Sequence, residues 1–204
     1  ISNDQNLILT YNGEIYNFQE LRIELESLGH TFRSKTDSEV VLNSWKEWGE
    51  SCVLKFNGMF AFAIWDSNLQ SLFLVRDRYG IKPLYYAQFG NVFLFSSEQK
   101  SIMEHPKFKK EADYEAFFEY FTFQNLFTNK TLFKNVNLLE PASIACINGQ
   151  KGLQIKKYWD YQFEDPDEKY SQSEYEEELN RLIKQAVNRQ LVTDVELGSY
   201  LSGG

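Results

Sequence analysis

Apolar residues in the first part of the chain form a strand-like run and then take helical spacing. Residues 7–11 are β-prone and end at Asn12-Gly13, a pair typical of tight turns because glycine accepts positive φ. From Phe18 to Leu28 the apolar positions then recur every three or four residues, and Gly29 follows as a C-cap. This pattern predicts a strand, a turn and an amphipathic helix.

Helical spacing returns twice more. A second helix is predicted to begin with Asp37 or Ser38 as its N-cap and to end at Gly49. A third is predicted after Ser173, which forms a capping box with Glu176. One face of this third helix is apolar, through Tyr175, Leu179, Leu182, Ile183, Ala186, Val187 and Leu191.

Paired strands are predicted between these helices. The β-prone runs are Met59–Trp65, Ser71–Val75, Leu84–Phe89, Val92–Ser96, Ala142–Ile147 and Leu153–Tyr158. Turn residues connect the first four runs closely, which indicates an antiparallel meander, and the last two runs, separated by Asn148-Gly149, indicate another hairpin. Because residues 59–65 are apolar at nearly every position, we expect both faces of that strand to be covered. Helices together with paired strands favour a layered α+β fold.

The composition changes near the C-terminal end of the sequence. Acidic residues, Pro166 and Ser171 interrupt the apolar pattern over residues 160–172, which we interpret as a linker. A strand predicted over residues 197–201 then enters a glycine-containing loop. The 204 residues therefore suggest one large domain and the beginning of another. Both ends of the sequence suggest a piece cut from a longer chain.

Charge and composition exclude several classes of function. A net charge of −8 and a pI near 4.9 argue against nucleic acid as a partner, because phosphate binding needs clustered Lys and Arg. Neither an export signal nor an apolar run of the ~18 residues that a membrane span needs is found. Two widely spaced cysteines do not form a disulfide framework, so we expect a reducing, cytoplasmic location.

Candidate chemistry begins at Asn12-Gly13-Glu14. The Asn side-chain amide and the Gly backbone N–H are two neutral donors of the kind that an oxyanion hole requires, although a bare Asn-Gly is more often a hairpin turn. Asp37 is either a helix N-cap or a carboxylate that binds a substrate ammonium group. The sequence alone leaves both alternatives open.

Other reactive side chains are interpreted as structural. Cys52 and Cys146 lie in apolar runs, so we expect buried thiols with raised pKa values. His30 and His105 have no second ligand at metal-binding spacing.

Two further clusters are also given structural roles. Arg76, Asp77 and Arg78 are predicted to form an ion-pair brace around the turn at Gly80. The aromatic residues between 114 and 123 are predicted to pack in the core or at a domain interface.

Four ordered motifs resemble one known family. They are Tyr11–Asn17, Thr36–Glu39, Gly58–Ala63 and Arg76–Tyr86. Together they are similar to the glutamine amidotransferase domain of glutamine-dependent asparagine synthetases. Leu201-Ser202-Gly203-Gly204 resembles the start of the pyrophosphate-binding loop in the synthetase domain of the same enzymes.

This resemblance implies a fold and a domain order. The expected fold is an α+β, four-layer αββα sandwich of antiparallel sheets, the N-terminal-nucleophile type. The first helix and strand of an α/β ATP-pyrophosphatase-type domain would follow. The implied domains are the amidotransferase domain, residues 1–159, without its N-terminal segment; a linker, residues 160–172; and the beginning of the synthetase domain, residues 173–204.

The resemblance also implies roles for individual residues. Asn12 and Gly13 would stabilise the oxyanion through the side-chain amide and the backbone N–H, and Glu14 and Asp37 would bind the amino group of glutamine. Leu201, Ser202, Gly203 and Gly204 would begin the binding loop for ATP, which acts with Mg²⁺. No residue is expected to bind metal directly. Ser97 to Lys100 is expected to face the synthetase domain.

The implied reaction belongs to the complete enzyme. Glutamine hydrolysis supplies ammonia, which attacks a β-aspartyl-AMP made from aspartate and ATP. Family members use an N-terminal cysteine as nucleophile, and this sequence begins with Ile1, so we expect it to be inactive and to bind no cofactor tightly by itself. A homodimer is left open.

Three alternatives remain. An amidotransferase of the same architecture could amidate another acceptor, whose binding residues would follow Gly204. A non-catalytic domain could use the same residues to bind an amino acid. A glucosamine-phosphate or purine-pathway amidotransferase is disfavoured, because neither is expected to carry Leu201-Ser202-Gly203-Gly204 after the long helix.

Overall fold

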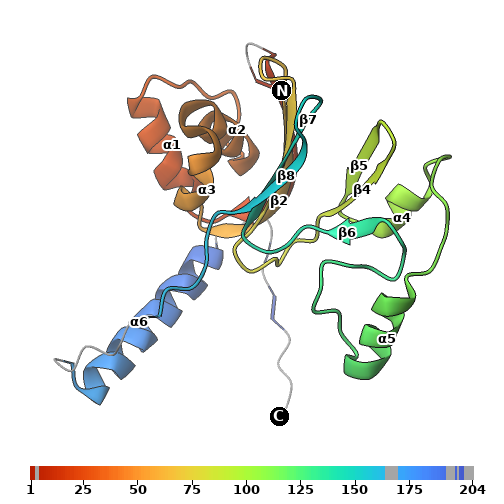
Figure 1. Cartoon of the computed structure of the whole chain (residues 1–204). Coiled ribbons are helices and arrows are strands. Elements are labelled where there is room, and N and C mark those ends of the chain that lie inside the picture. The colour runs from red at the N-terminus through yellow and green to blue at the C-terminus, as the bar shows by residue number, and fades with distance from the viewer. Residues whose placement is uncertain (3–4, 164–169, 192–195, 197, 200–204) are drawn as a thin grey trace. The chain divides into compact units, whose positions relative to one another are not determined.

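The computed structural model describes residues 1–2, 5–163, 170–191, 196 and 198–199. The chain divides into two compact units, Ile1–Asp160 and Tyr161–Gly204. Nearly all of the regular structure belongs to the first unit (Figure 1).

The helices of the first unit are α1 (Phe18–Ser27), α2 (Asp37–Trp48), α3 (Cys52–Lys55), α4 (Gln99–Met103) and α5 (Tyr114–Phe123), with a 3₁₀ turn at Gly49–Ser51. Its strands are β1 (Leu7–Ile15), β2 (Gly58–Asp66), β3 (Ser71–Arg76), β4 (Tyr85–Phe89), β5 (Val92–Ser96), β6 (Val136–Leu138), β7 (Ser143–Asn148) and β8 (Gly152–Lys157). The predicted helices and strands of this unit are confirmed with shifts of at most one residue at their ends, except that β1 continues to Ile15, four residues beyond the predicted run.

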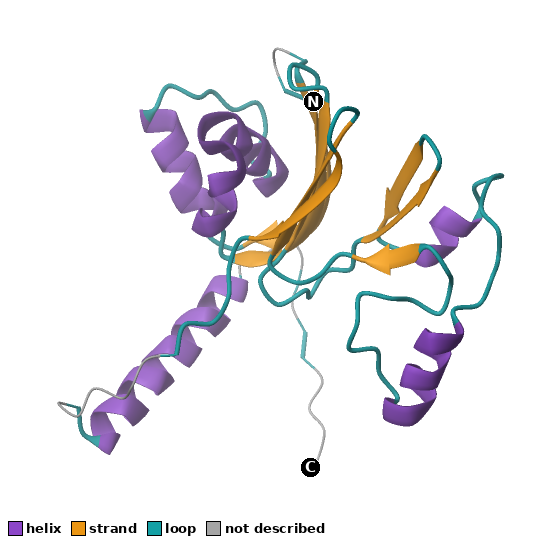
Figure 2. Cartoon of the chain, in the orientation of Figure 1, coloured by secondary structure: helices purple, strands orange, loops and turns teal. Residues whose placement is uncertain are grey.

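The strands form two antiparallel sheets. The larger has the order β1-β2-β3-β7-β8, and the smaller has the order β5-β4-β6. Figure 2 shows α1, α2 and α3 on one face of the larger sheet, the smaller sheet on its other side, and α4 and α5 beyond. The expected four-layer αββα sandwich is therefore confirmed.

The largest core cluster lies between the larger sheet and its helices. Val40, Val41 and Trp45 of α2 pack there against β2, through Phe60, Phe62 and Ile64. The alternate residues of β2, Ala61 and Ala63, belong to a second cluster with Leu84 and Tyr86 on the side of the smaller sheet. Both faces of β2 are therefore buried, as its continuous apolar sequence predicted.

The predicted single meander is wrong. β3 pairs with β2 and with β7, whereas β4 and β5 belong to the other sheet. The chain leaves the larger sheet at Asp77, which is 1% exposed and accepts backbone N–H groups from Tyr79, Ile81 and Lys82. These bonds replace a continued strand ladder and turn the chain toward the smaller sheet.

The ion-pair brace predicted around Gly80 is also wrong in its chemistry. Arg76 donates to the carbonyls of Gly80, Lys82 and Leu139. Arg78 donates to the carbonyls of Leu54 and Phe56 instead of a carboxylate. The turn is braced, but by charged side chains on backbone groups, because loop carbonyls and N–H groups need partners when buried.

Two helix starts differ from their predictions. Asp37 is the first residue of α2, not its N-cap; Thr36 precedes it and makes no side-chain capping bond. The helix of the second unit, α6 (Gln172–Gln190), has Ser171 as N-cap and a capping box with Glu174, two residues before the predicted pair. Both Ser-x-x-Glu frames occur in the sequence, so spacing alone could not choose between them.

The aromatic residues of α5 are not in the core. Only Ala116 of this helix is buried, whereas Tyr114, Phe118 and Phe121 are 71–74% exposed. The alternative, a domain interface, stays a prediction.

The second unit is described mainly through α6. Its predicted apolar face is present, and the large side chains on it are exposed within the described residues. Residues 197 and 200–204 lie outside the described part of the chain, and with them the predicted strand over 197–201. No helix in the described ranges is long and apolar enough to span a membrane.

Candidate functional site

Two donors from β1 fix the carboxylate of Asp37. The Tyr11 hydroxyl donates to Oδ2 at 2.6 Å, and the backbone N–H of Ile15 donates to the same oxygen at 3.1 Å. Burial, and then the bond to Asp37, raises the pKa of Tyr11 well above its ordinary value, so the phenol keeps its proton. Asp37 is thereby held at the end of β1, with its second oxygen, Oδ1, accepting no bond from the described residues.

The backbone N–H of Gly13 points to the open edge of β1. Gly13 lies opposite Phe60, whose N–H and carbonyl both bond to Asp77. Gly13 and Phe60 are therefore a pair without mutual hydrogen bonds, and Gly13 turns its N–H to the same side as Ile15. Within the described residues β1 is an edge strand, so no strand covers this side.

The sequence predicted a turn at Asn12-Gly13, and this prediction is wrong. Both residues lie inside β1, which continues to Ile15. A Cβ on Gly13 would be 2.3 Å from the Met59 carbonyl oxygen, and one on Gly58 would be 2.1 Å from that of Glu14. Glycine is needed here for close contact between two strands.

The side chain of Asn12 reaches the smaller sheet. Its Nδ2 donates to Oγ of Ser97 at 3.1 Å, directly after β5. The two side chains border a pocket of about 250 Å³ between the sheets, which Ala61 and Ala63 also line. Because alanine side chains are short, the polar pair has room where the neighbouring core is tightly packed.

The structure brings some of the predicted site residues together and leaves one apart. Asn12 and Gly13 lie in the second half of β1, and Asp37 is bonded to Ile15, the last residue of that strand. Glu14 is exposed, and strand alternation puts it on the same face as Asn12, opposite Tyr11. Glu14 therefore lies on the face of β1 opposite Tyr11, the residue whose hydroxyl donates to Asp37.

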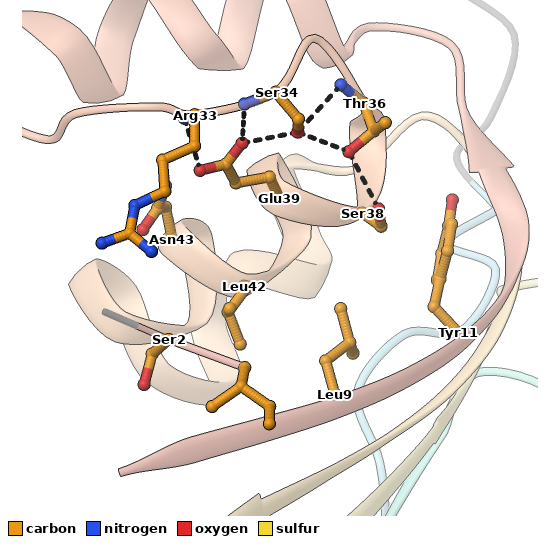
Figure 3. A pocket seen from close by; sticks show the side chains of 11 residues that line it. Ser2, Leu9, Tyr11, Arg33, Ser34, Thr36, Ser38, Glu39, Leu42 and Asn43 are labelled. Carbon is orange, nitrogen blue, oxygen red and sulfur yellow. Dashed lines mark hydrogen bonds between the residues drawn. The ribbon is translucent and has the colours of Figure 1, made fainter. Parts of the chain in front are cut away.

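A larger pocket of about 520 Å³ lies between β1 and the start of α2 (Figure 3). Leu9 and Tyr11 of β1 form one wall, and Thr36 and Ser38 flank Asp37 along another. The open edge of β1 and the start of α2 therefore share one recess.

The loop before α2 is held by Glu39. This carboxylate accepts from the Ser34 hydroxyl and from the backbone N–H groups of Arg33 and Ser34, and Ser34 and Thr36 hydroxyls bond in turn (Figure 3). Burial raises the pKa of Glu39, but these bonds lower it by more, so the net pKa is below the usual value. In the sequence, Glu39 is only the last residue of the motif Thr36–Glu39. Its bonds back to Arg33 and Ser34 depend on the tertiary structure.

Neither cysteine lies at this site. Cys52 is buried, and burial raises its thiol pKa; burial also raises the pKa of Cys146, which is only half-buried against the expectation. His30 bonds to Glu47 at 2.7 Å. The described residues contain no cluster suited to a metal ion.

Leu201, Ser202, Gly203 and Gly204 lie outside the described residues. Tyr11 and Ser97 are the contacts that sequence reasoning missed. The sequence predicts Tyr11 as an ordinary strand residue and Ser97 as facing the synthetase domain, so only the fold reveals their partners within the first unit.

Comparison with known proteins agrees with this geometry. Residues 1–159 match the family model described as glutamine amidotransferase domain, so the chain belongs to that family. Residues 178–204 match the model described as asparagine synthase.

Relatives cover nearly the whole chain. Asparagine synthetase [glutamine-hydrolyzing] 3 of Bacillus subtilis is 41% identical over 96% of this chain and 32% of its own length. Asparagine synthetase [glutamine-hydrolyzing] 1 of the same organism is 37% identical over 98% of this chain and 31% of its own length. The chain thus spans about a third of these relatives.

A solved structure supports the fold. The glutamine phosphoribosylpyrophosphate amidotransferase of B. subtilis, complexed with ADP and GMP, has a TM-score of 0.54 at 19% identity, covering 79% of this chain and 31% of that protein. At this identity the likeness concerns the fold alone.

Proposed function

We propose that this chain supplies the glutamine-binding part of a glutamine-dependent asparagine synthetase. In the complete enzyme, glutamine is hydrolysed to glutamate and ammonia, and the ammonia attacks a β-aspartyl-AMP formed from aspartate and ATP. The two family matches, in this order along the chain, support the combination. The proposed domains are residues 1–159 for the amidotransferase, 160–172 for a linker and 173–204 for the start of the synthetase.

One observation carries the proposed chemistry: the Gly13 N–H faces the open edge of β1, and the preceding residue, Asn12, carries a side-chain amide. Attack on the glutamine amide turns its carbonyl oxygen into an oxyanion. The Gly13 N–H and the Asn12 Nδ2 group would donate to that oxygen. Such donors stabilise the transition state more than the ground state, and losing one costs about 10²–10³ in kcat.

Asp37 gives the substrate its orientation. Ile15, whose N–H bonds Asp37, lies two residues beyond Gly13, about 7 Å along the strand. In an extended glutamine, four bonds separate the amide carbon from the ammonium nitrogen, a comparable span. With the amide at Gly13, the ammonium would meet the available Oδ1 of Asp37, and Glu14 would add charge from the other face.

The remaining chemistry comes from elsewhere in the complete protein. The raised pKa values of Cys52 and Cys146 do not support either as nucleophile, so we propose another cysteine of the complete protein. ATP, with Mg²⁺, would bind the synthetase domain, beginning at residues 201–204. A cytoplasmic location and a homodimer stay predictions from the sequence.

The test uses the complete protein with aspartate, ATP and glutamine, and measures asparagine and glutamate in the same reaction. Asparagine and glutamate forming together is the expected result. Glutamate without asparagine would overturn the proposed acceptor and leave an amidotransferase of other specificity. Ammonium chloride in place of glutamine is the control, because asparagine synthesis should then continue without glutamate.

A further inference from the structure

The Asn12 side chain is held at one point by the other sheet. Asn12 belongs to β1 of the larger sheet, and Ser97 follows β5 of the smaller one. Among the described residues, the Asn12 carboxamide makes one hydrogen bond, from its Nδ2 to the Ser97 Oγ at 3.1 Å. The bond therefore crosses from one sheet to the other at the residue proposed to bind the oxyanion.

The pocket around this bond leaves the Asn12 amide with little side-chain packing to restrain it. Ala61, directly opposite Asn12 on β2, and Ala63 leave about 250 Å³ beside the carboxamide. With so little packing, the Asn χ2 torsion, which is broad in any case, has few steric restraints. A hydrogen bond is then the main restraint on the direction of the amide.

Amide geometry connects this restraint to catalysis. A carboxamide carries two N–H bonds that diverge from one nitrogen. If Ser97 accepts one of them, the direction of the other is fixed. We propose that Ser97 is a positioning residue, which holds the Asn12 amide so that its second N–H is directed to the oxyanion. This rests on the proposed glutaminase function.

Ser97 would not touch the substrate in this arrangement. Its removal leaves Asn12 in place but allows the amide to rotate, so the donor is aligned for only part of the time. Binding of glutamine through Asp37 would be unaffected, because that carboxylate is held by Tyr11 and Ile15 and not by Ser97. The expected signature is a loss in kcat with an unchanged KM.

The experiment measures glutamate release by the complete enzyme carrying Ser97→Ala. We expect kcat to fall about three- to tenfold, the range of one neutral hydrogen bond, with KM within about twofold. Asparagine synthesis from ammonium chloride should be unchanged. Ser97→Thr keeps a hydroxyl and should restore most of the activity.

Ser96→Ala is the matched control. Ser96 lines the same pocket, but its Oγ accepts from the Glu98 N–H, not from Asn12. This variant should retain wild-type kcat. Equal losses in Ser96→Ala and Ser97→Ala would indicate a general effect on the loop and overturn the positioning role.

A double-mutant cycle completes the test. In an Asn12→Ala background, Ser97→Ala should change kcat by less than about 1.5-fold, because its target is gone. The same three- to tenfold loss in both backgrounds would overturn the inference, as would an unchanged kcat in Ser97→Ala alone. Failure of the wild-type enzyme to release glutamate would instead overturn the proposed function.

Discussion

Asp77 offers the strongest test of how the first unit is held together. This carboxylate is 1% exposed and accepts four backbone N–H groups: Tyr79 and Ile81 on Oδ1, Lys82 and Phe60 on Oδ2, at 3.0–3.2 Å. It joins the turn after β3 to Phe60, near the start of β2. Asp77→Ala removes every one of these bonds at once.

The expected cost follows from where the donors are left. The Phe60 N–H is buried and would lose its partner, which costs about 1–3 kcal/mol. The three loop donors are part-buried and can reach water, so each costs about 0.5–1 kcal/mol. We expect Asp77→Ala to lower the free energy of unfolding by about 3–5 kcal/mol, and Tm by about 6–20 °C.

Tryptophan fluorescence is the appropriate assay, because it reports on the first unit alone. All four tryptophans lie within Ile1–Asp160, namely Trp45, Trp48, Trp65 and Trp159. Urea and thermal unfolding of the variants can therefore be followed without a signal from the second unit.

Asp66→Ala is the control. Asp66 also accepts two backbone N–H groups in a turn, from Asn68 and Leu69, but both donors are exposed. It should cost about 1 kcal/mol or less. If Asp77→Ala destabilised the unit no more than Asp66→Ala, the bonds of Asp77 would not hold the turn and the reasoning would be refuted.

The remaining predictions concern the site and the buried thiol. Asn12→Ala in the complete enzyme should lower glutaminase kcat about 10²-fold or more while ammonia-dependent synthesis continues; equal loss of both activities would indicate misfolding. Asp37→Ala should raise the glutamine KM by about 10–100-fold. Tyr11→Phe removes one of the two donors to Asp37 and should raise KM by about 3–10-fold with kcat nearly unchanged. If steady-state kinetics showed an unaltered KM, Asp37 would be a structural residue only. Burial raises the pKa of Cys52, so at alkaline pH the folded chain keeps a proton that the unfolded chain releases. The contribution of this thiol to the free energy of unfolding is therefore fully present below about pH 8.5 and decreases as the pH rises. Urea midpoints from pH 8 to 10 should fall less in Cys52→Ala than in wild type, and parallel curves would contradict this origin of the pH dependence.

The sequence predicted the helices and strands well where local pattern determines them. The helix over Phe18–Ser27 buries Leu21 and Leu25, as its three- and four-residue spacing requires. β2 is apolar throughout and is covered on both faces. These features depend on the periodicity of neighbouring residues, which is present in the sequence itself.

The errors at the candidate site have a different origin. Asn12-Gly13 has the composition of a turn, yet it continues a strand, because Gly13 and Gly58 allow two strands to approach closely. Asp37 has the position of an N-cap, yet its carboxylate bonds to Tyr11 and Ile15. A local signal was overridden by partners far along the chain.

The motifs alone determined the family, the layered α+β class and the residues to examine, because residue types in fixed order are properties of the sequence. Only the tertiary structure decided that the Gly13 N–H faces an open edge, that Asp37 is held by Tyr11, and that Ser97 bonds Asn12 across 85 positions. Those facts depend on strand register and on the packing of one sheet against another. Both arise from many weak contacts formed together, which no short segment encodes.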